Sequence, residues 1–168
     1  SSDLVVNRLV VWKHVDKVIE ACHQLGLSLL VVGDGPERRN LENLASQFDN
    51  VTFLGERSQH EIHKIINSAR CFVLNSSFEA TSYSLLEARS SGLFCIANAN
   101  TGSEEIINHM VDGILCGSTG VPLIEALLLF KNEPSFAERA SRLGRQDTEA
   151  RFSMKRNYFE IYRLAKSL

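Results

Sequence analysis

The chain has 168 residues, 44% of them hydrophobic, and its 18 basic and 20 acidic side chains give a formal net charge of −2. This length can bury one sizeable core but not two ordinary domains, so residues 1–168 are expected to form a single domain. The balanced charge argues against nucleic acid as a partner. No apolar stretch reaches the roughly 20 residues of a membrane-spanning helix. The chain shows no secretory signal, so a cytoplasmic location is expected.

Short apolar runs alternate with segments of helical period along the chain. Six runs are predicted to be strands: Leu4–Val11, Leu27–Val32, Val51–Leu54, Cys71–Leu74, Phe94–Ala97 and Ile114–Cys116. The segments between them are predicted to be helices, at about Asp16–Leu25, Glu37–Gln47, Gln59–Ser68, Ser84–Ser91 and Glu104–Met110. This βα alternation builds a parallel sheet with helices on both faces. The predicted fold class is therefore α/β, a Rossmann-like three-layer domain.

After Gly120 the pattern becomes helical only. Helices are predicted near Val121–Phe130, Ser135–Leu143 and Ser153–Ser167. The last of them has apolar residues at helical spacing, which predicts a stripe that packs against another surface.

The four cysteines, Cys22, Cys71, Cys95 and Cys116, stand apart from one another. Because the chain has no Cys-x-x-Cys pair, it offers neither a structural zinc site nor a thioredoxin-like motif. We expect reduced thiols that serve as small apolar side chains.

Ligands of a parallel sheet bind beyond the carboxyl ends of its strands, so the loops there are the candidate site. After the first predicted strand, Arg8 and Lys13 stand five residues apart. Two cations in this position could clamp a diphosphate and neutralise the charge of a leaving group. The spacing alone means little, because most pairs of basic residues at this spacing are ordinary surface charge.

The loop after the second strand begins with Gly33-Asp34-Gly35-Pro36-Glu37. Its glycines permit a sharp strand-to-helix turn, and Pro36 and Glu37 suit a first helical turn. These structural roles explain the motif, although loops of this kind commonly border ligands.

The loop after the fourth strand carries two carboxylates, Glu79 and Glu87, across the start of a predicted helix. Unpaired amides at that start form an anion site suited to a diphosphate. Glu87 could accept hydrogen bonds from ribose hydroxyls, and Glu79 could contact a sugar. A cap at Glu79 and a paired, half-buried Glu87 would explain the spacing as well, and both interpretations stay open.

Taken in order, these segments resemble the C-terminal domain of GT-B glycosyltransferases of family 4, also called glycosyl transferases group 1. The resemblance covers nearly the whole chain. It includes the Arg8-to-Lys13 spacing, the block from Val32 to Glu37, Phe53-Leu54-Gly55 and the E-x7-E motif of Glu79 and Glu87. Gly102-Ser103-Glu104-Glu105 and Asp112-Gly113-Ile114-Leu115 extend it.

The resemblance implies roles for particular residues. Arg8, Lys13 and Glu79 would be catalytic, with the cations on the diphosphate and Glu79 on the donor sugar. Glu87 would hold the ribose, and the loop after Gly55 would border the nucleobase. The implied donor-binding set is Gly33, Gly35, Gly55, Ala80, Thr81, Ser82, Tyr83 and Glu87.

The resemblance also implies an activity. It is retaining transfer of a sugar from a UDP-, GDP- or ADP-sugar to a glycan or lipid-linked acceptor, without a cofactor or a metal. The chain has no Asp-x-Asp motif to hold one. The acceptor would bind an N-terminal domain that this chain lacks, so the chain alone is expected to be inactive. Surface polysaccharide synthesis and peripheral membrane association of the full-length enzyme are further expectations.

Two departures separate the chain from the family pattern. Asn7 stands where the family usually has glycine before the arginine, and Ala80-Thr81-Ser82 stands where it has Gly-Phe-Gly. Fewer glycines leave the loop less freedom to bring its amides to phosphate, although the hydroxyls of Thr81 and Ser82 could substitute. Two alternatives therefore remain: a GT-B sugar-nucleotide epimerase, and a noncatalytic nucleotide-binding module.

Overall fold

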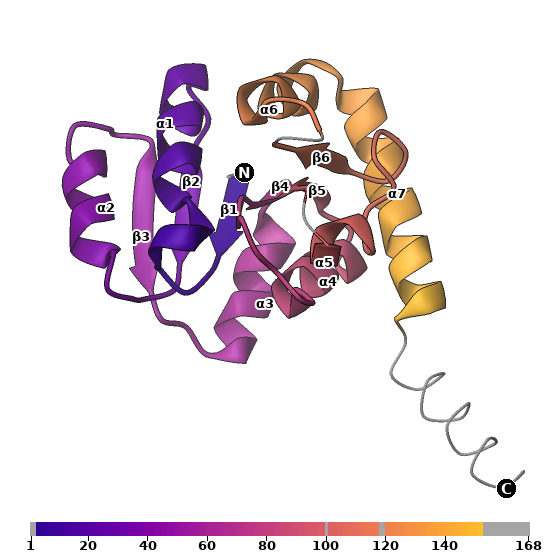
Figure 1. Ribbon diagram of the computed structural model, residues 1–168, viewed down its shortest axis with the longest axis horizontal. Helices are drawn as coiled ribbons and strands as arrows, with labels where there is room; N and C mark the ends of the chain where they lie inside the picture. The colour runs from indigo at the N-terminus through magenta and orange to yellow at the C-terminus, as the bar shows by residue number, and fades with distance from the viewer. Residues whose placement is uncertain (1–2, 100, 118–119, 153–168) are drawn as a thin grey trace, which may run out of the picture.

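The structure, a computed structural model, describes residues 3–99, 101–117 and 120–152 (Figure 1). Its strands are β1 (Asp3–Val6), β2 (Leu29–Val32), β3 (Val51–Gly55), β4 (Cys71–Leu74), β5 (Phe94–Asn98) and β6 (Ile114–Cys116). Its helices are α1 (Val15–Leu25), α2 (Arg38–Ala45), α3 (Gln59–Ser68), α4 (Tyr83–Ser90), α5 (Thr101–Glu104), α6 (Leu123–Asn132) and α7 (Pro134–Arg151), with a short 3-10 helix η1 (Val11–Lys13).

All six strands pair in parallel, in the order β3-β2-β1-β4-β5-β6. The chain runs from β1 outward to β2 and β3, then returns to place β4 on the other side of β1. The order therefore reverses between β1 and β4, and in open α/β sheets the crevice at such a reversal is the usual ligand site. The predicted α/β class with a parallel sheet is confirmed.

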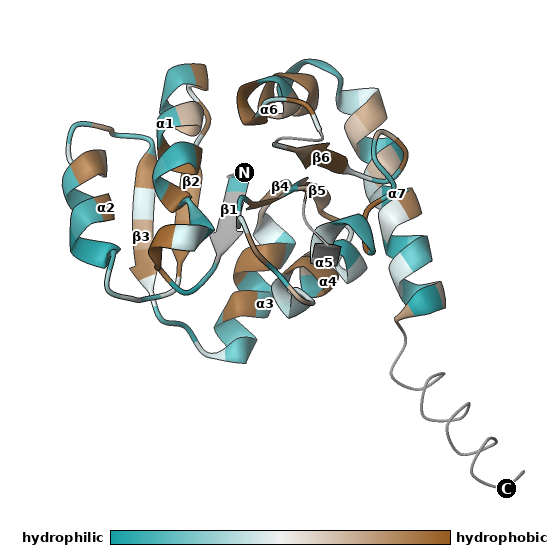
Figure 2. Ribbon diagram, in the orientation of Figure 1, coloured by the Kyte–Doolittle hydropathy of each residue, from teal (hydrophilic) through white to brown (hydrophobic). Residues whose placement is uncertain are grey.

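Helices cover both faces of the sheet and leave two apolar cores. In β4, Cys71 and Val73 face the core beneath α1, α2, α6 and the start of α7, whereas Phe72 and Leu74 face the core beneath α3 and α4. Figure 2 shows mostly hydrophobic strands between helices of mixed character. Burial on both faces explains why the strands read as continuous apolar runs.

The predicted end of the first strand is wrong. β1 stops at Val6, and the chain continues as a packed loop before η1. Leu9 is fully buried in that loop, where its amide donates to the Asp34 carbonyl at 2.9 Å and its carbonyl accepts from the Glu37 amide at 3.0 Å. A loop that buries its side chains and pairs its backbone has the apolar pattern of a strand.

Two helices also differ from their predicted bounds. α5 ends at Glu104, and the chain then turns where the Asp112 carboxylate accepts hydrogen bonds from the amide and side chain of Asn108, at 2.9 and 2.7 Å. α7 runs on to Arg151 instead of stopping at Leu143. The helix predicted for 153–167 lies outside the described residues.

A buried ion network that the sequence did not reveal joins α4 to α7. Arg89 is 1% exposed, and its guanidinium donates to Asp112 Oδ1 at 3.0 Å, Asp147 Oδ2 at 3.1 Å and Thr148 Oγ1 at 3.1 Å. These bonds satisfy a charge that would otherwise be costly to bury. They fix α4, which borders the cavity described below, against the C-terminal helix.

All four cysteines are reduced and buried. Burial raises the pKa of the Cys22 and Cys95 thiols to about 12, so these sulfurs stay protonated and inert. In the described part of the chain, no helix combines the length and apolar composition that crossing a membrane requires.

Candidate functional site

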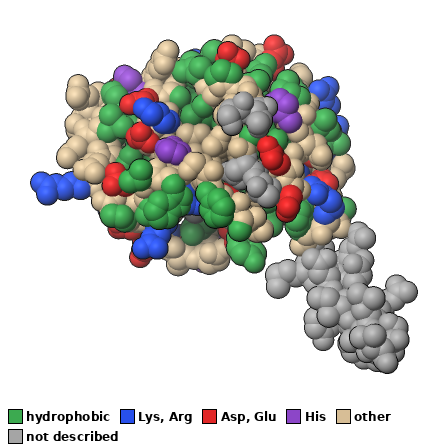
Figure 3. Space-filling model, in the orientation of Figure 1, with side chains coloured by type: hydrophobic (Ala, Val, Ile, Leu, Met, Phe, Trp, Pro, Cys, Tyr) green, Lys and Arg blue, Asp and Glu red, His purple; other side chains and the backbone are tan. Residues whose placement is uncertain are grey.

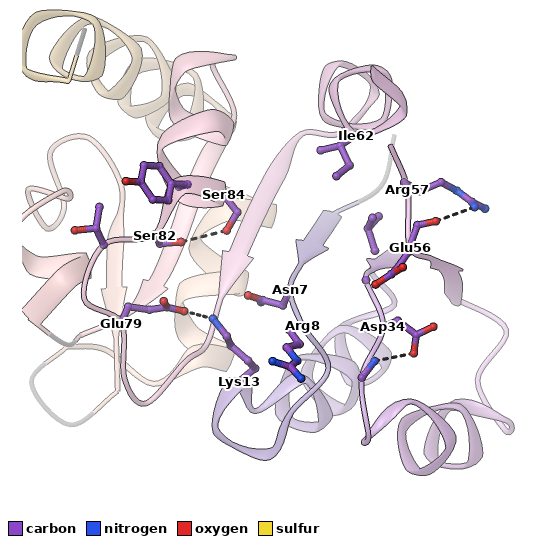
Figure 4. A pocket seen from close by; sticks show the side chains of 15 residues that line it. Asn7, Arg8, Lys13, Asp34, Glu56, Arg57, Ile62, Glu79, Ser82 and Ser84 are labelled. Carbon is purple, nitrogen blue, oxygen red and sulfur yellow. Dashed lines mark hydrogen bonds and ion pairs between the residues drawn. The ribbon is translucent and has the colours of Figure 1, made fainter. Parts of the chain in front are cut away.

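A cavity of about 780 Å³ opens at the carboxyl ends of the central strands, at the reversal between β1 and β4 (Figure 4). Segments after four different strands contribute to its wall. The lining residues are Asn7, Arg8, Lys13, Val32, Gly33, Asp34, Gly35, Glu56, Arg57, Ile62, Glu79, Thr81, Ser82, Tyr83 and Ser84.

The glycines after β2 let the first loop pack against the second. A Cβ at Gly33 would lie 1.8 Å from the Asn7 carbonyl oxygen, and one at Gly35 would lie 2.3 Å from the Leu9 carbonyl oxygen. Gly33 also has φ +135°, which favours glycine. Both glycines therefore serve the contact between loops, and both line the cavity as well.

Asp34 shapes the same turn. Its carboxylate accepts from the Gly35 amide at 2.7 Å and from Arg38 Nη1 at 2.7 Å. The Arg38 guanidinium, together with the amide bond, holds the pKa of Asp34 below its usual value. Asp34 is therefore ionised near neutral pH and acts as an anchor for the loop.

Three residues with predicted catalytic roles face the cavity together. Lys13 Nζ and Glu79 Oε1 form an ion pair across 66 positions of sequence, and their side chains are only 15% and 13% exposed. Arg8 is exposed and, among the described residues, has no ion-pair partner. Figure 4 shows its guanidinium on the same side of the cavity as Lys13. Two cations thus meet at the strand reversal, one paired and one available.

The loop that carries Glu79 is held in place from behind by α5. The Gly102 amide donates to the Glu79 carbonyl at 3.1 Å. A Cβ at Gly102 would lie 2.5 Å from that carbonyl oxygen and 2.6 Å from the Ala80 carbonyl oxygen. The Gly102-Ser103 motif therefore positions Glu79 through the backbone.

The amino end of α4 opens onto the cavity. Ser82 is its N-cap, and the Ser82 hydroxyl accepts from the Leu85 amide at 3.3 Å. The amides of Tyr83 and Ser84, in the first helical turn, have no partner within an α-helix, and both residues line the cavity. A helix start in this position favours a bound anion.

Three predicted donor-binding residues lie outside the cavity wall. Ala80 is exposed, and Gly55 is buried behind the wall, where its carbonyl accepts from the Gly33 amide at 2.9 Å. Glu87 is half-buried one turn beyond Ser84, and its carboxylate accepts from Gln59 Nε2 at 2.5 Å. This contact matches the second interpretation of Glu87 given above, a half-buried carboxylate that has a partner within the protein.

Sequence reasoning gave no site role to seven residues of the wall, one of which, Val32, is the last residue of β2. Asn7, Asp34 and Ser84 are neighbours of residues that were singled out, so their positions after β1, β2 and β4 could have drawn attention to them. Ile62 comes from α3 and gave no signal. Glu56 and Arg57 follow Gly55 in the segment expected to border a nucleobase. In the described ranges, no group of three or more His, Cys, Asp or Glu side chains could hold a metal ion.

Large apolar side chains are exposed on η1, which carries Lys13 of the cavity wall, and on the segment from Phe78 to Tyr83, which carries Glu79. Val11 and Trp12 of η1 are 67% and 52% exposed, and Phe78 and Tyr83 are 71% and 78% exposed. The Ser77 amide donates to the Trp12 carbonyl at 2.9 Å, which brings the two groups side by side. Figure 3 shows hydrophobic side chains gathered over the loops between η1 and α4. We call these four residues the apolar rim.

The chain matches the protein family described as Glycosyl transferases group 1 over residues 4–147. It is 33% identical over 132 residues to the lipopolysaccharide core biosynthesis glycosyltransferase LpsD of Rhizobium meliloti (strain 1021), covering 76% of this chain and 38% of that protein. It is 32% identical over 130 residues to N-acetyl-alpha-D-glucosaminyl L-malate synthase of Bacillus anthracis, covering 72% and 34%.

Among solved structures, Anabaena HepE in complex with UDP and glucose has the same fold, with a TM-score of 0.89 at 20% identity. The match covers 99% of this chain and 48% of that one. The chain therefore spans less than half the length of each of these three proteins.

Proposed function

Since this chain belongs to the glycosyl transferases group 1 family, we propose that it is the donor-binding half of a glycosyltransferase, which takes a sugar from a nucleoside diphosphate sugar. One observation carries the proposal. Arg8, Lys13 and the amino end of α4 converge on one cavity at the strand reversal. Two cations and a helix start in one place match the charge of a diphosphate.

In the proposed reaction, the bond between the anomeric carbon of the sugar and the diphosphate oxygen breaks. The bonding electrons leave with the nucleoside diphosphate, so negative charge develops on the oxygen that departs. A hydroxyl oxygen of the acceptor forms the new bond to the anomeric carbon, and its proton passes to the diphosphate. Arg8 and Lys13 stabilise the transition state, in which this charge develops, more strongly than they stabilise the bound donor. This difference lowers the barrier. This role supports transfer without a metal ion, and chelation by EDTA is then expected to leave the transfer rate unchanged.

Glu79 is proposed to contact the donor sugar, and Glu87 the ribose. The pairing of Glu79 with Lys13 places a carboxylate next to the proposed phosphate position, where the sugar is attached. Glu87 lies in α4, one turn beyond Ser84, and its carboxylate reaches Gln59 at the start of α3. One oxygen of its carboxylate accepts from Gln59, and the other is proposed to accept from a ribose hydroxyl.

The acceptor is proposed to bind a second domain, and that domain is proposed to face the apolar rim. Exposed apolar patches beside a ligand cavity commonly mark interaction surfaces. The greater length of LpsD is consistent with a second domain. Its name, a lipopolysaccharide core biosynthesis glycosyltransferase, supports a glycan or lipid-linked acceptor in surface polysaccharide synthesis. We propose transfer with retention of anomeric configuration at the cytoplasmic side of a membrane. NMR of the product anomer tests the retention.

Calorimetry on the full-length protein with UDP, GDP, ADP and their glucose conjugates tests the donor assignment. At least one nucleoside diphosphate is expected to bind, and Arg8→Ala is expected to weaken it by roughly tenfold or more because a charge-assisted bond is lost. Lys17→Ala, an exposed lysine on α1 that pairs with Glu20, is the matched control and should leave the affinity unchanged. Binding of none of these nucleotides would refute the proposal.

A further inference from the structure

Asn7 is the wall residue whose hydrogen bonding the fold leaves incomplete. It directly follows β1, and its amide donates to the Val32 carbonyl at 3.0 Å, so its backbone is fixed beside β2. The residue is 8% exposed and lines the cavity. Its side-chain nitrogen Nδ2 is buried without a hydrogen-bond partner among the described residues.

An unpartnered side-chain nitrogen in this place is costly, because burial removes water from Nδ2 and the protein supplies no replacement acceptor. The carboxamide caps none of the described helices, and the atoms of Asn7 that lie closest to the missing Cβ of Gly33 are all backbone atoms. The local fold therefore does not require this side chain. A group that enters the cavity can supply the missing acceptor.

The surroundings define the chemistry of that acceptor. Arg8 and Lys13 line the same cavity, and Figure 4 shows Asn7 near Arg8 and near the Lys13–Glu79 pair. A site with two cations attracts an anionic oxygen, which accepts hydrogen bonds and cannot donate one when fully ionised. The terminal torsion of asparagine is broad, so the carboxamide can turn its nitrogen toward such an oxygen.

We propose that Asn7 Nδ2 donates a hydrogen bond to a phosphate oxygen of the bound nucleoside diphosphate. This inference rests on the proposed function and adds a third phosphate ligand to Arg8 and Lys13. It assigns a binding role to one of the two places at which the chain departs from the family pattern. The donor is neutral, so it adds affinity without adding charge to the site.

Three variants of the full-length protein test the proposal by calorimetry with UDP, GDP and ADP. Asn7→Ala removes the donor and is expected to weaken binding of the nucleotide by roughly tenfold, the effect of one bond to a charged group. Asn7→Asp keeps the shape of the side chain but places a carboxylate against the phosphate. It should therefore weaken nucleotide binding more than Asn7→Ala does. Asn43→Ala, an exposed asparagine on α2, is the control.

Thermal melting of the unliganded proteins separates this role from a structural one. Because Asn7→Ala deletes a buried amide that has no partner, its melting temperature should equal or exceed that of the wild type. A structural role would instead lower both the melting temperature and the affinity.

Two outcomes overturn the inference and leave the donor site in place. In one, the wild type and Asn7→Ala bind the nucleotide equally. In the other, Asn7→Asp binds as tightly as the wild type, which would indicate a hydroxyl in place of a phosphate oxygen. If the wild type binds none of the three nucleotides, the proposed function fails and the inference fails with it.

Discussion

At the scale of single residues, Lys13 and Glu79 cannot be assigned independent roles. Their ion pair is largely shielded from water, so each side chain sets the position of the other. A ligand phosphate near Lys13 would compete with Glu79 for the ammonium group. Removing the charge of Glu79 should therefore release Lys13 toward the phosphate and at the same time remove a contact to the sugar.

Glu79→Gln is expected to bind the free nucleoside diphosphate within about twofold of the wild type, or more tightly. It should bind the nucleotide-sugar about tenfold more weakly, because a charge-assisted hydrogen bond is lost. Glu87→Gln should weaken both ligands by about tenfold, since both contain the ribose. Calorimetry on the two variants makes the comparison. Equal losses for both ligands in Glu79→Gln would show that Glu79 does not contact the sugar.

At the scale of elements, the cavity depends on how closely α5 approaches the loop before α4. Only a hydrogen atom fits on Gly102 at this contact, since a methyl group would lie 2.5 Å from the Glu79 carbonyl oxygen. The collision is with backbone, which cannot rotate away. A larger residue must move the loop and the glutamate it carries.

Gly102→Ala is therefore expected to lower the affinity for the nucleotide-sugar and to destabilise the chain by about 1–3 kcal/mol, the usual effect of overpacking. Gly26→Ala is the control. Gly26 has φ +63°, but no atom lies within 4 Å of the position of its missing Cβ. This variant should lose stability through strain and keep its affinity. Urea unfolding and calorimetry measure the two effects, and unchanged affinity in Gly102→Ala would contradict the assigned contact.

The same scale shows what the sequence could predict. Every predicted strand exists, because burial on both faces leaves continuous apolar runs such as Cys71–Leu74. The end of β1 was misplaced because Leu9 and Val10 are buried in a loop whose backbone pairs with the next loop. The helix predicted to end at Leu143 continues because Gly144, a residue that often follows a helix, here permits close packing. A Cβ at Gly144 would lie 2.9 Å from the Asp112 carbonyl oxygen.

For the candidate site, the sequence could indicate which residues lie near the cavity but not which side chains contact one another. Charged residues after strands, such as Arg8 and Glu79, could be found from the rule that parallel strands bring their carboxyl ends together. The partner of each residue could not. The contact of Lys13 with Glu79, and that of Glu87 with Gln59, depends on side-chain directions across one loop and three helices.

At the scale of the whole molecule, the Arg89 network secures the C-terminal helix. Arg89→Leu would leave Asp112 buried without its cation, and a broken buried pair of this kind costs about 3–5 kcal/mol. Arg145→Ala removes an exposed arginine of α7 that pairs with Glu149, and should cost less than about 1 kcal/mol. Urea unfolding gives both free energies. A loss in Arg89→Leu no larger than in the control would show that the network does not stabilise the fold.

A buried acid makes the stability of the molecule depend on pH. Asp3 is 1% exposed, and burial raises its pKa from 3.8 to about 6, although the Arg70 guanidinium opposes the shift. The folded chain therefore holds this proton more tightly than the unfolded chain. The free energy of unfolding should fall by about 2 kcal/mol as pH rises from 4 to 7, because ionisation of Asp3 then disfavours the folded state.

Asp3→Asn removes this titration. The difference in unfolding free energy between the variant and the wild type should shift in favour of the variant between pH 4 and pH 7, by about 2 kcal/mol. Urea unfolding at four pH values across this range measures the difference. A constant difference would show that the pKa of Asp3 is the same in the folded and unfolded chains.

The strand order has a consequence for synthesis on the ribosome. β1 is made before the other five strands of this sheet, yet one of its two neighbours, β4, begins only at Cys71. At about 5–20 residues per second, β1 therefore waits several seconds with an open edge that another chain could pair with. The ionised form of Asp3, at the start of β1, is the kind of side chain that discourages such pairing. A nucleotide gives no protection during that interval, because the loop of Glu79 does not yet exist.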